Sequence, residues 1–271
     1  MPSDSRLTNL EYGRQGSGVL EVGIARNAAH PLPGEFAGYP PRPCKVYRMG
    51  QVPYRQAWEL QQSLVEQRKA QEIEDTILFL EHPPVITLGR NAKSEHVLSS
   101  PEALEQSGVE VVETDRGGEV TYHGPGQLVG YPILDLGAIR RDVVWYVRTL
   151  EEALIRTAKD FGLSAGRMEG RPGVWVNQAK VAAIGIHISR WVTSHGFALN
   201  LQTDLSFFRH IVPCGITAYP VTSFRQLLGK TVNRFLVEEH IVQHLGALLG
   251  LEICWAQPER LERREPCQPM C

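Results

Sequence analysis

Three apolar segments between residues 173 and 201 restrict the fold of this chain more than any other feature. We expect strands at Gly173–Val176, Lys180–Ser189 and His195–Leu201, because each segment is short, rich in β-branched or aromatic residues and bounded by turn residues. Only a turn at Asn177 and Gln178 separates the first two. Strands joined by such short connections must pair antiparallel, since a parallel pair needs a crossover of a dozen or more residues.

Segments with helical periodicity lie on both sides of this strand group. We expect helices from Pro53 to about Glu74, from Asp142 to Gly162, and from about Thr231 to Leu249. The remaining expected elements are a short helix capped by Ser100 and strands at Thr76–Leu80, Val85–Leu88, Val109–Val112 and Gln127–Leu134. The sequence therefore predicts an α+β fold in which helices flank a mixed, largely antiparallel sheet.

We predict a single domain over residues 45–255. Residues 1–44 contain many Gly, Pro, Ser and Asn and have no sustained period, so we expect an irregular N-terminal extension. Residues 256–271 form a charged tail that contains proline. No internal repeat or convincing linker divides the region between them.

The composition excludes several classes of protein. Hydrophobic residues make up 42% and charged residues 21% of the 271 residues, as in ordinary globular proteins. No apolar run approaches the ~20 residues of a membrane helix, and no secretory or transit signal is apparent. A net charge of −2 gives no general nucleic-acid footprint. We expect a cytoplasmic protein that binds neither membranes nor nucleic acids.

The cysteines are odd in number and widely scattered. In a cytosolic protein this pattern is typical of free thiols. A metal pair at the C-terminal end is an alternative, but no second pair or histidine cluster accompanies it, and we expect no metal. The five residues are Cys44, Cys214, Cys254, Cys267 and Cys271.

A glycine-rich segment, RGGEVTYHGPGQLVGY from Arg116 to Tyr131, stands out locally. Five glycines and one proline in 16 residues indicate a loop that turns tightly or approaches a ligand closely. Arg116, Thr121, Tyr122 and His123 add polar groups that a simple turn rarely carries. The spacing of a phosphate-binding P-loop is absent, and an ordinary connection between strands remains the alternative.

Lys180 begins a strand that alternates with period two. Without a bulge, its side chain shares the apolar face of Ala182 and Ile184. There it must find a partner, reach past the strand end to solvent, or lower its pKa. Gly185 and Gly196 on the same ribbon leave room for a narrow acyl chain or for close packing against a helix.

Cys214 is a candidate nucleophile. In the segment IVPCGI it lies between Pro213 and Gly215, which favours a rigid turn over a buried element. His210 is four residues earlier, and His123, His187 and His195 are other potential partners for a Cys–His pair.

Together these segments resemble the lipoyl(octanoyl) transferase family. RGGEVTYHGPGQLVGY, the lysine in KVAAIGIHI, HGFALNL and PCGI occur in the family's order between about Lys45 and Gly229. EHPPVITLGR upstream and TSFRQLLG downstream are also similar to it. The N-terminal extension and the C-terminal tail lie outside the resemblance.

The resemblance implies a reaction, its partners and a fold. The octanoyl donor would be octanoyl-acyl carrier protein. The acceptor would be a specific lysine of lipoyl domains, in the E2 subunits of 2-oxo acid dehydrogenases and the glycine cleavage H protein. The reaction is the first step of protein lipoylation by the endogenous pathway and needs no cofactor. The fold would be that of lipoate- and biotin-protein ligases.

The resemblance also assigns roles to residues. The acyl-thioester cysteine falls on Cys214 and the catalytic lysine on Lys180. The residues that line the substrate are Arg116, Gly117, Gly118, Glu119, Val120, Thr121, Tyr122, His123, Ala183, Ile184, Gly185, Gly196, Phe197 and Ala198.

Three other functions fit parts of this pattern. An ATP-dependent lipoate- or biotin-protein ligase shares the fold but needs no nucleophilic cysteine. A Cys–His thioesterase or peptidase would release free acid without an acceptor. A non-catalytic acyl-binding protein would keep its function after alkylation of Cys214.

Overall fold

The computed structural model describes residues 41–212 and 219–261. Its α-helices are α1 (Tyr54–Lys69), α2 (Pro101–Gln106), α3 (Val143–Asp160), α4 (Phe224–Leu228) and α5 (Arg234–Leu249). Its strands are β1 (Arg42–Gln51), β2 (Asp75–Glu81), β3 (Val85–Leu88), β4 (Glu110–Glu113), β5 (Val120–His123), β6 (Gln127–Ile133), β7 (Gly166–Met168), β8 (Arg171–Val176), β9 (Ala179–Ser189), β10 (Val192–Asn200) and β11 (Leu251–Ala256). Short 3-10 turns occur at Ser94–His96, Leu205–His210 and Pro258–Arg260.

The main sheet has eight strands in the order β11-β1-β2-β6-β10-β9-β8-β7. Only β1 pairs parallel, with β11 on one side and β2 on the other, and the other neighbours are antiparallel. The predicted mixed, largely antiparallel sheet is therefore confirmed. β8, β9 and β10 form the expected antiparallel group, and the predicted turn at Asn177 and Gln178 has positive φ at both residues.

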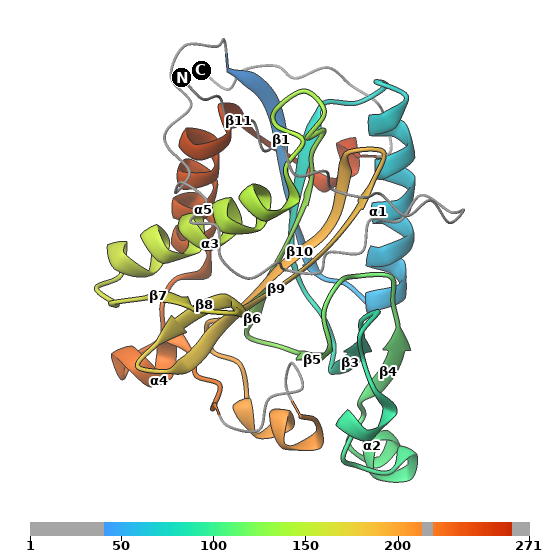
Figure 1. Cartoon of the computed structure of the whole chain (residues 1–271), viewed down its shortest axis with the longest axis vertical. Helices are drawn as coiled ribbons and strands as arrows, with labels where there is room; N and C mark the ends of the chain where they lie inside the picture. Colours follow the sequence, from blue (N-terminus) through green and yellow to red (C-terminus); the bar gives the residue numbers. More distant parts are fainter. Residues whose placement is uncertain (1–40, 213–218, 262–271) are drawn as a thin grey trace, which may run out of the picture.

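Helices cover both faces of this sheet (Figure 1). α3 and α5 pack together on one face, and their leucines join strand residues such as Phe79 and Val181 in the larger core. α1 lies on the opposite face, where Leu64 packs with Tyr131 and Ala198 in a second core. Both faces of the main sheet are therefore apolar, because each is buried against helices.

A smaller sheet of three strands, β4-β3-β5, lies beside the lower end of the main sheet (Figure 1). β5 occupies part of the glycine-rich segment for which the sequence predicted a loop. All four of its residues are buried, and they pair antiparallel with β3 along their whole length. The high glycine content hid this strand, because the glycines lie on either side of it.

Most predicted boundaries agree with the structure to within a few residues. Ser100 and Asp142 cap α2 and α3 as expected, each accepting a backbone hydrogen bond three residues on. α5 begins at Arg234 because Asn233 supplies its N-cap. The edge strand β11 was not predicted. It follows Gly250, whose positive φ ends α5 and turns the chain back alongside β1.

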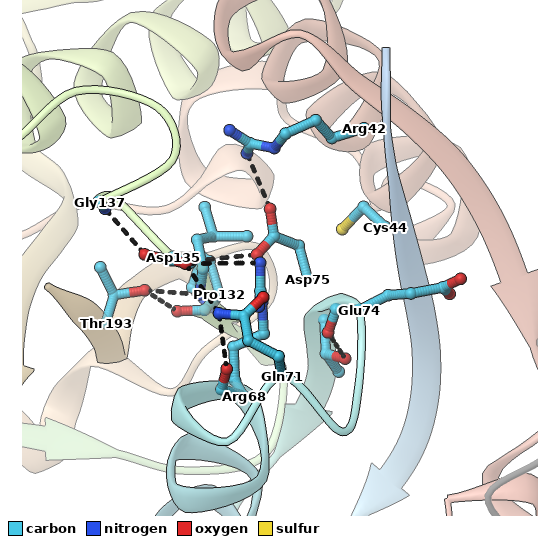
Figure 2. Close-up of polar contacts among 12 residues, drawn as sticks. Arg42, Cys44, Arg68, Gln71, Glu74, Asp75, Pro132, Asp135, Gly137 and Thr193 are labelled. Atoms are coloured by element: carbon cyan, nitrogen blue, oxygen red, sulfur yellow. Dashed lines mark hydrogen bonds and ion pairs between the residues drawn. The ribbon is translucent and has the colours of Figure 1, made fainter. Parts of the chain in front are cut away.

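The buried carboxylate of Asp75 connects several elements around the first residues of β2 (Figure 2). Asp75 accepts hydrogen bonds from Arg42 at 2.7 Å, from Arg68 at 2.9 Å and from the backbone N–H of Asp135 at 3.0 Å. These contacts join β1, α1, β2 and the chain that follows β6. Only 2% of Asp75 is exposed, so its charge depends on these donors.

The two cysteines that the structure describes differ in state. Cys44 is a free thiol, as predicted, and it is fully buried. Cys254 is disulfide-bonded, so the prediction of free thiols is wrong for this residue. No helix within residues 41–212 and 219–261 is both long and apolar enough to span a membrane.

Replacing Asp75 with alanine will remove the closer carboxylate of the buried Arg68 guanidinium and leave the 3.7 Å ion pair with Asp135 as its one remaining ion pair among the described residues. We expect a loss of about 3–5 kcal/mol in the free energy of unfolding, measured by urea denaturation. Glu66→Ala is the control. Glu66 pairs only with Lys69 and Arg190 among the described residues and is largely exposed, so its loss should cost no more than about 1 kcal/mol. Equal effects of the two substitutions would contradict this role for Asp75.

Candidate active site

A β-bulge decides where the side chain of Lys180 points. Trp175 of β8 pairs with Lys180, but the neighbouring Val174 pairs with Ala182, which leaves Val181 as an extra residue in β9. Val181 and Ala182 both enter the larger core under α3 and α5. Lys180 is thereby turned to the opposite face. The shared face with Ala182 and Ile184 was expected only without a bulge, and the bulge removes that condition.

Lys180 lies at a small hollow on the face of the sheet that carries Ala183 and Ala198. Its Nζ is 4.8 Å from the centre of the Trp175 ring, and only 8% of the residue is exposed. The hollow is lined by Thr121, Gln127, Lys180, Ala183, Ala198, Asn200, Phe208 and Val221. It thus brings together four of the predicted site residues from β5, β9 and β10.

The small residues on β9 and β10 serve two purposes. Ala183 and Ala198 pair directly with each other and line the small hollow. At Gly185, a Cβ atom would lie 2.9 Å from the carbonyl oxygen of Gly117, so this glycine admits the neighbouring loop. At Gly196, a Cβ atom would collide with the backbone of β6 at Gly130. The two glycines therefore allow close packing against a loop and a strand, and room for an acyl chain stays a prediction.

Arg116 anchors the loop that crosses this face. Its guanidinium donates to the carbonyl oxygen of Thr87 at 2.6 Å and to the Thr87 hydroxyl at 2.9 Å. The adjacent N–H of Gly117 donates to the carbonyl oxygen of Ile186 at 2.8 Å. These bonds connect β3 of the small sheet to β9 of the main sheet, and the hollow lies between the two sheets.

The side chains of the predicted substrate segment Arg116–His123 face in two directions, toward the hollow and away from it. Val120 and Tyr122 enter a third core with Ile86 and Phe208, whereas Thr121 lines the hollow. Glu119 accepts a hydrogen bond from His96 at 2.9 Å.

The same alternation applies on β9 and β10. Ile184 and Phe197 pack in the larger core, away from the hollow. Their neighbours on the two strands face the other way, as the period of a strand requires.

A chain of hydrogen bonds crosses the floor of the site. The amide of Gln127 accepts from His123 at 2.7 Å and donates to Asn200 at 2.9 Å, and Asn200 donates to the carbonyl oxygen of Thr222 at 3.0 Å. The N–H of Thr222 in turn donates to the carbonyl oxygen of Lys180 at 2.9 Å. Every link is directional, so the chain fixes the backbone of Lys180 relative to β5 and β6.

Two buried histidines are held neutral: His123, which begins this series of hydrogen bonds, and His82, whose ring lies beside it. Burial lowers the pKa of His82 to about 4, while its ring donates to the carbonyl oxygen of Val52 and accepts from the Tyr131 hydroxyl, both at 2.7 Å. Burial, together with the nearby His82 and Arg116, holds the pKa of His123 well below its usual range. A neutral His123 that donates from Nδ1 to Gln127 presents Nε2 as an acceptor.

A third buried imidazole faces a carboxylate. His195 Nε2 lies 2.7 Å from Asp115 Oδ1, immediately before the Arg116 anchor. Burial lowers the pKa of His195, and the hydrogen bond and charge of Asp115 only partly oppose this. His195 and Asp115 therefore brace the loop and lie outside the lining of the hollow.

Cys214 lies outside the described residues, in the gap 213–218. The described residues on either side of it are fixed to the site. The N–H of Val212 donates to the carbonyl oxygen of His96 at 2.8 Å, and the N–H of Lys180 donates to the carbonyl oxygen of Pro220 at 2.9 Å.

Sequence reasoning missed four lining residues: Gln127, Asn200, Phe208 and Val221. A signal existed for Asn200, which shares the face of Gly196 and Ala198 by the period of the strand. Gln127 is the first residue of a predicted strand and carries a buried amide. Phe208 and Val221 had no such signal, because they reach the hollow from irregular chain.

The neutral histidines predict a pH dependence of stability. A histidine whose pKa is lowered on folding binds its proton more tightly in the unfolded chain. Stability is therefore fully present above the unfolded pKa of about 6.5 and is lost as pH falls toward about 4, by up to about 3 kcal/mol for His82 alone. Urea denaturation at pH 7.5 and 5 should show this decline, and His82→Gln should reduce it. An identical decline in wild type and variant would contradict the assignment.

Comparison with known proteins places the chain in a family. Residues 53–246 match the model of the lipoyl protein ligase A/B catalytic domain. An octanoyltransferase of Gloeobacter violaceus is 53% identical over 84% of this chain and 99% of its own length. An octanoyltransferase of Solibacter usitatus is 51% identical over 78% of this chain and 96% of its own length.

Solved structures show the same fold at low sequence identity. A lipoate-protein ligase A bound with ATP has a TM-score of 0.67 at 16% identity, covering 82% of this chain and 92% of the ligase. The bipartite lipoate protein ligase of Thermoplasma acidophilum, from an archaeal lipoylation system with its E2 lipoyl domain, has a TM-score of 0.66 at 16% identity, covering 82% of this chain and 90% of that one. The expected lipoate ligase fold is confirmed. With about half of all aligned positions identical to curated members, this chain belongs to the octanoyltransferase family, which shares the lipoyl protein ligase A/B catalytic domain.

Proposed function

We propose that this protein transfers an octanoyl group from octanoyl-acyl carrier protein to a specific lysine of lipoyl domains, through a thioester on Cys214. The observation that carries the proposal is the placement of Lys180. The bulge at Val181 turns this lysine out of the core and into a small hollow beside Ala183 and Ala198, in a chain that belongs to the octanoyltransferase family.

The first step is thioester exchange. The thiolate of Cys214 attacks the carbonyl carbon of the octanoyl thioester, and the phosphopantetheine thiol of the carrier leaves. An unperturbed thiol has a pKa of about 8.5 and is mostly protonated at neutral pH, so the attack needs a base or a neighbouring cation. Lys180 supplies one or the other when its side chain contacts Cys214.

The second step forms the amide. The lysine amine of the lipoyl domain attacks the acyl-enzyme carbonyl, the bond to Cys214 breaks, and a neutral Lys180 accepts the proton of the amine. Backbone N–H groups of the glycine-rich loop or of the Cys214 turn would stabilise each oxyanion. Neither of the two proposed reaction steps needs a cofactor.

The hydrogen-bonded floor of the site supports this use of Lys180. The hydrogen-bond chain from His123 through Gln127 and Asn200 to Thr222 ends on the backbone of Lys180, and so fixes the point from which this side chain enters the hollow. The residues in this chain are uncharged at neutral pH, because burial holds the pKa of His123 low. An uncharged floor suits an acyl chain that carries no charge.

Partners and location follow from the same proposal. The related Thermoplasma ligase belongs to a lipoylation system with an E2 lipoyl domain. We propose lipoyl domains of 2-oxo acid dehydrogenase E2 subunits and of the glycine cleavage H protein as the acceptors here. A cytoplasmic location stays a prediction.

An ATP-dependent ligase remains the alternative to exclude by experiment, because a related structure with the same fold binds ATP. A ligase activates free octanoate with ATP, whereas the proposed enzyme draws on a preformed thioester. Octanoylation of a lipoyl domain from octanoyl-acyl carrier protein without ATP distinguishes the two.

Two substitutions test the chemistry. Incubation with octanoyl-acyl carrier protein and no acceptor should add one octanoyl group to the wild-type protein, detected by intact mass and mapped to the Cys214 peptide. Cys214→Ala should show no adduct. Lys180→Ala should slow acylation by a factor on the order of 10²–10⁴, the usual contribution of a general acid–base group.

The matched control is Lys93→Ala. Lys93 is an exposed lysine that pairs with Glu95, so its loss should leave the rate of acylation unchanged. An octanoyl adduct on Cys214→Ala protein, or equal rates for the two lysine variants, would contradict the assignment.

The hollow predicts selection by acyl chain length. Each methylene removed from water contributes ~0.8 kcal/mol, or about fourfold in kcat/KM. Ala198→Leu adds three carbons at the paired small residues and should lower kcat/KM for octanoyl more than for hexanoyl thioesters. The ratio of the two values is the measurement, so a general loss of activity cancels. An unchanged ratio would place the acyl chain elsewhere.

A further inference from the structure

Three potential metal ligands converge on the outer side of the helix layer. His240 Nδ1 lies 2.7 Å and His244 Nε2 lies 2.6 Å from the same oxygen, Oδ2 of Asp160. The three ligand atoms are all within 4.8 Å of one another. Asp160 is exposed, and the two histidines are partly exposed, so solvent and ions reach the group.

The two histidines are four residues apart on α5, so they lie on one face of the helix, one turn apart. Asp160 comes from α3, whose backbone packs closely against α5. The ring of Phe161 stands edge-on to His240 at 5.4 Å and limits how far that imidazole can turn. Two ligands are thus preset by one helix, and the third is contributed by its neighbour.

The position of Asp160 favours a bound cation. It is the last residue of α3, where the helix dipole leaves partial negative charge on the final carbonyl groups. A carboxylate at this end is repelled by those carbonyls unless positive charge lies beside it.

Two imidazole nitrogens and one carboxylate oxygen form the ligand set of zinc sites that keep an open fourth position. Ligand atoms around tetrahedral zinc lie about 3.4 Å apart, given bonds of about 2.0–2.1 Å. The present 2.6–2.7 Å separations are hydrogen bonds in which each imidazole N–H donates to Asp160. To bind the ion, each neutral ring would carry its proton on its other nitrogen, and the ligand atoms would move apart from Asp160 by less than about 1 Å.

We propose that Asp160, His240 and His244 form a site for Zn²⁺ or a similar divalent transition metal, which clamps α3 to α5. A water molecule completes the coordination. The site lies on the helices that cover the sheet face opposite to Ala183 and Ala198, so it is separate from the octanoyl chemistry. Binding would act on the stability of the folded protein.

Zinc titration of the full-length, chelator-treated protein at pH 7.5 tests this site. Isothermal calorimetry should show a site with an affinity in the micromolar range. Zinc should raise the unfolding temperature with the logarithm of its concentration above the Kd, as expected for a ligand of the folded state. Chelator should reverse the shift.

His244→Gln and Asp160→Asn separate metal binding from hydrogen bonding. The glutamine and asparagine side chains that these substitutions introduce still form hydrogen bonds but are poor metal ligands. We therefore expect each variant to bind zinc at least tenfold more weakly than the wild type and to show no rise in unfolding temperature with zinc. Gln243→Ala, one residue away on α5, is the matched control and should bind zinc as the wild type does. Because the cysteines are retained in every variant, zinc bound by thiols cancels in the comparison.

The results leave two outcomes. Loss of the zinc-dependent thermal shift in both ligand variants, with the control unchanged, supports the site. No shift in the wild-type protein, or the same shift in all four proteins, overturns it and leaves the three residues as a hydrogen-bonded helix contact.

Discussion

The anchoring of Arg116 is the interaction on which the rest of the site depends. Its guanidinium is bound to Thr87 of the small sheet, and the next residue, Gly117, is bound to Ile186 of the main sheet. A hollow between two sheets keeps its width only if the sheets are fixed to each other. Because a buried guanidinium is costly to leave without acceptors, the loop has one favourable position.

Gly185 makes this anchoring possible. The backbone of Gly117 approaches so closely that a side chain at position 185 would displace it. The loop, the glycine and the arginine therefore form one unit, although they lie about 70 residues apart in sequence. His195 adds a further contact to this unit, because its ring is hydrogen-bonded to Asp115, the residue before Arg116.

The sequence predicted the sheet, the helices and the residues near the site, because these follow from local periodicity and capping. The fold class, the short turn at Asn177 and the caps at Ser100 and Asp142 needed no tertiary information. The orientation of Lys180 did need it. A bulge is defined by the pairing of two strands, so the period of β9 alone could not decide which face this lysine occupies.

Four strands were not predicted: β1, β5, β7 and β11. β5 and β11 were missed for a related reason. Each is short, and each becomes a strand because a partner offers it hydrogen bonds along its length. The substrate segments show the same limit. A contiguous motif was predicted to line the substrate, but a strand presents alternate residues, so Val120 and Tyr122 support the site from behind while Thr121 faces it. The role of Cys214 rests on family resemblance, because it lies outside the described residues.

The burial of Cys44 gives this protein an internal probe of its own opening. The thiol is fully buried in β1, between β11 and β2, and burial together with the charge of Asp75 raises its pKa well above the usual value. A thiol reagent needs the exposed thiolate, so Cys44 becomes labelled only in molecules whose sheet has separated around β1. The rate of that labelling, divided by the rate for an unfolded thiol, measures how often the centre of the domain opens. A single residue with no part in the chemistry thus reports on the scaffold that holds the chemistry in place.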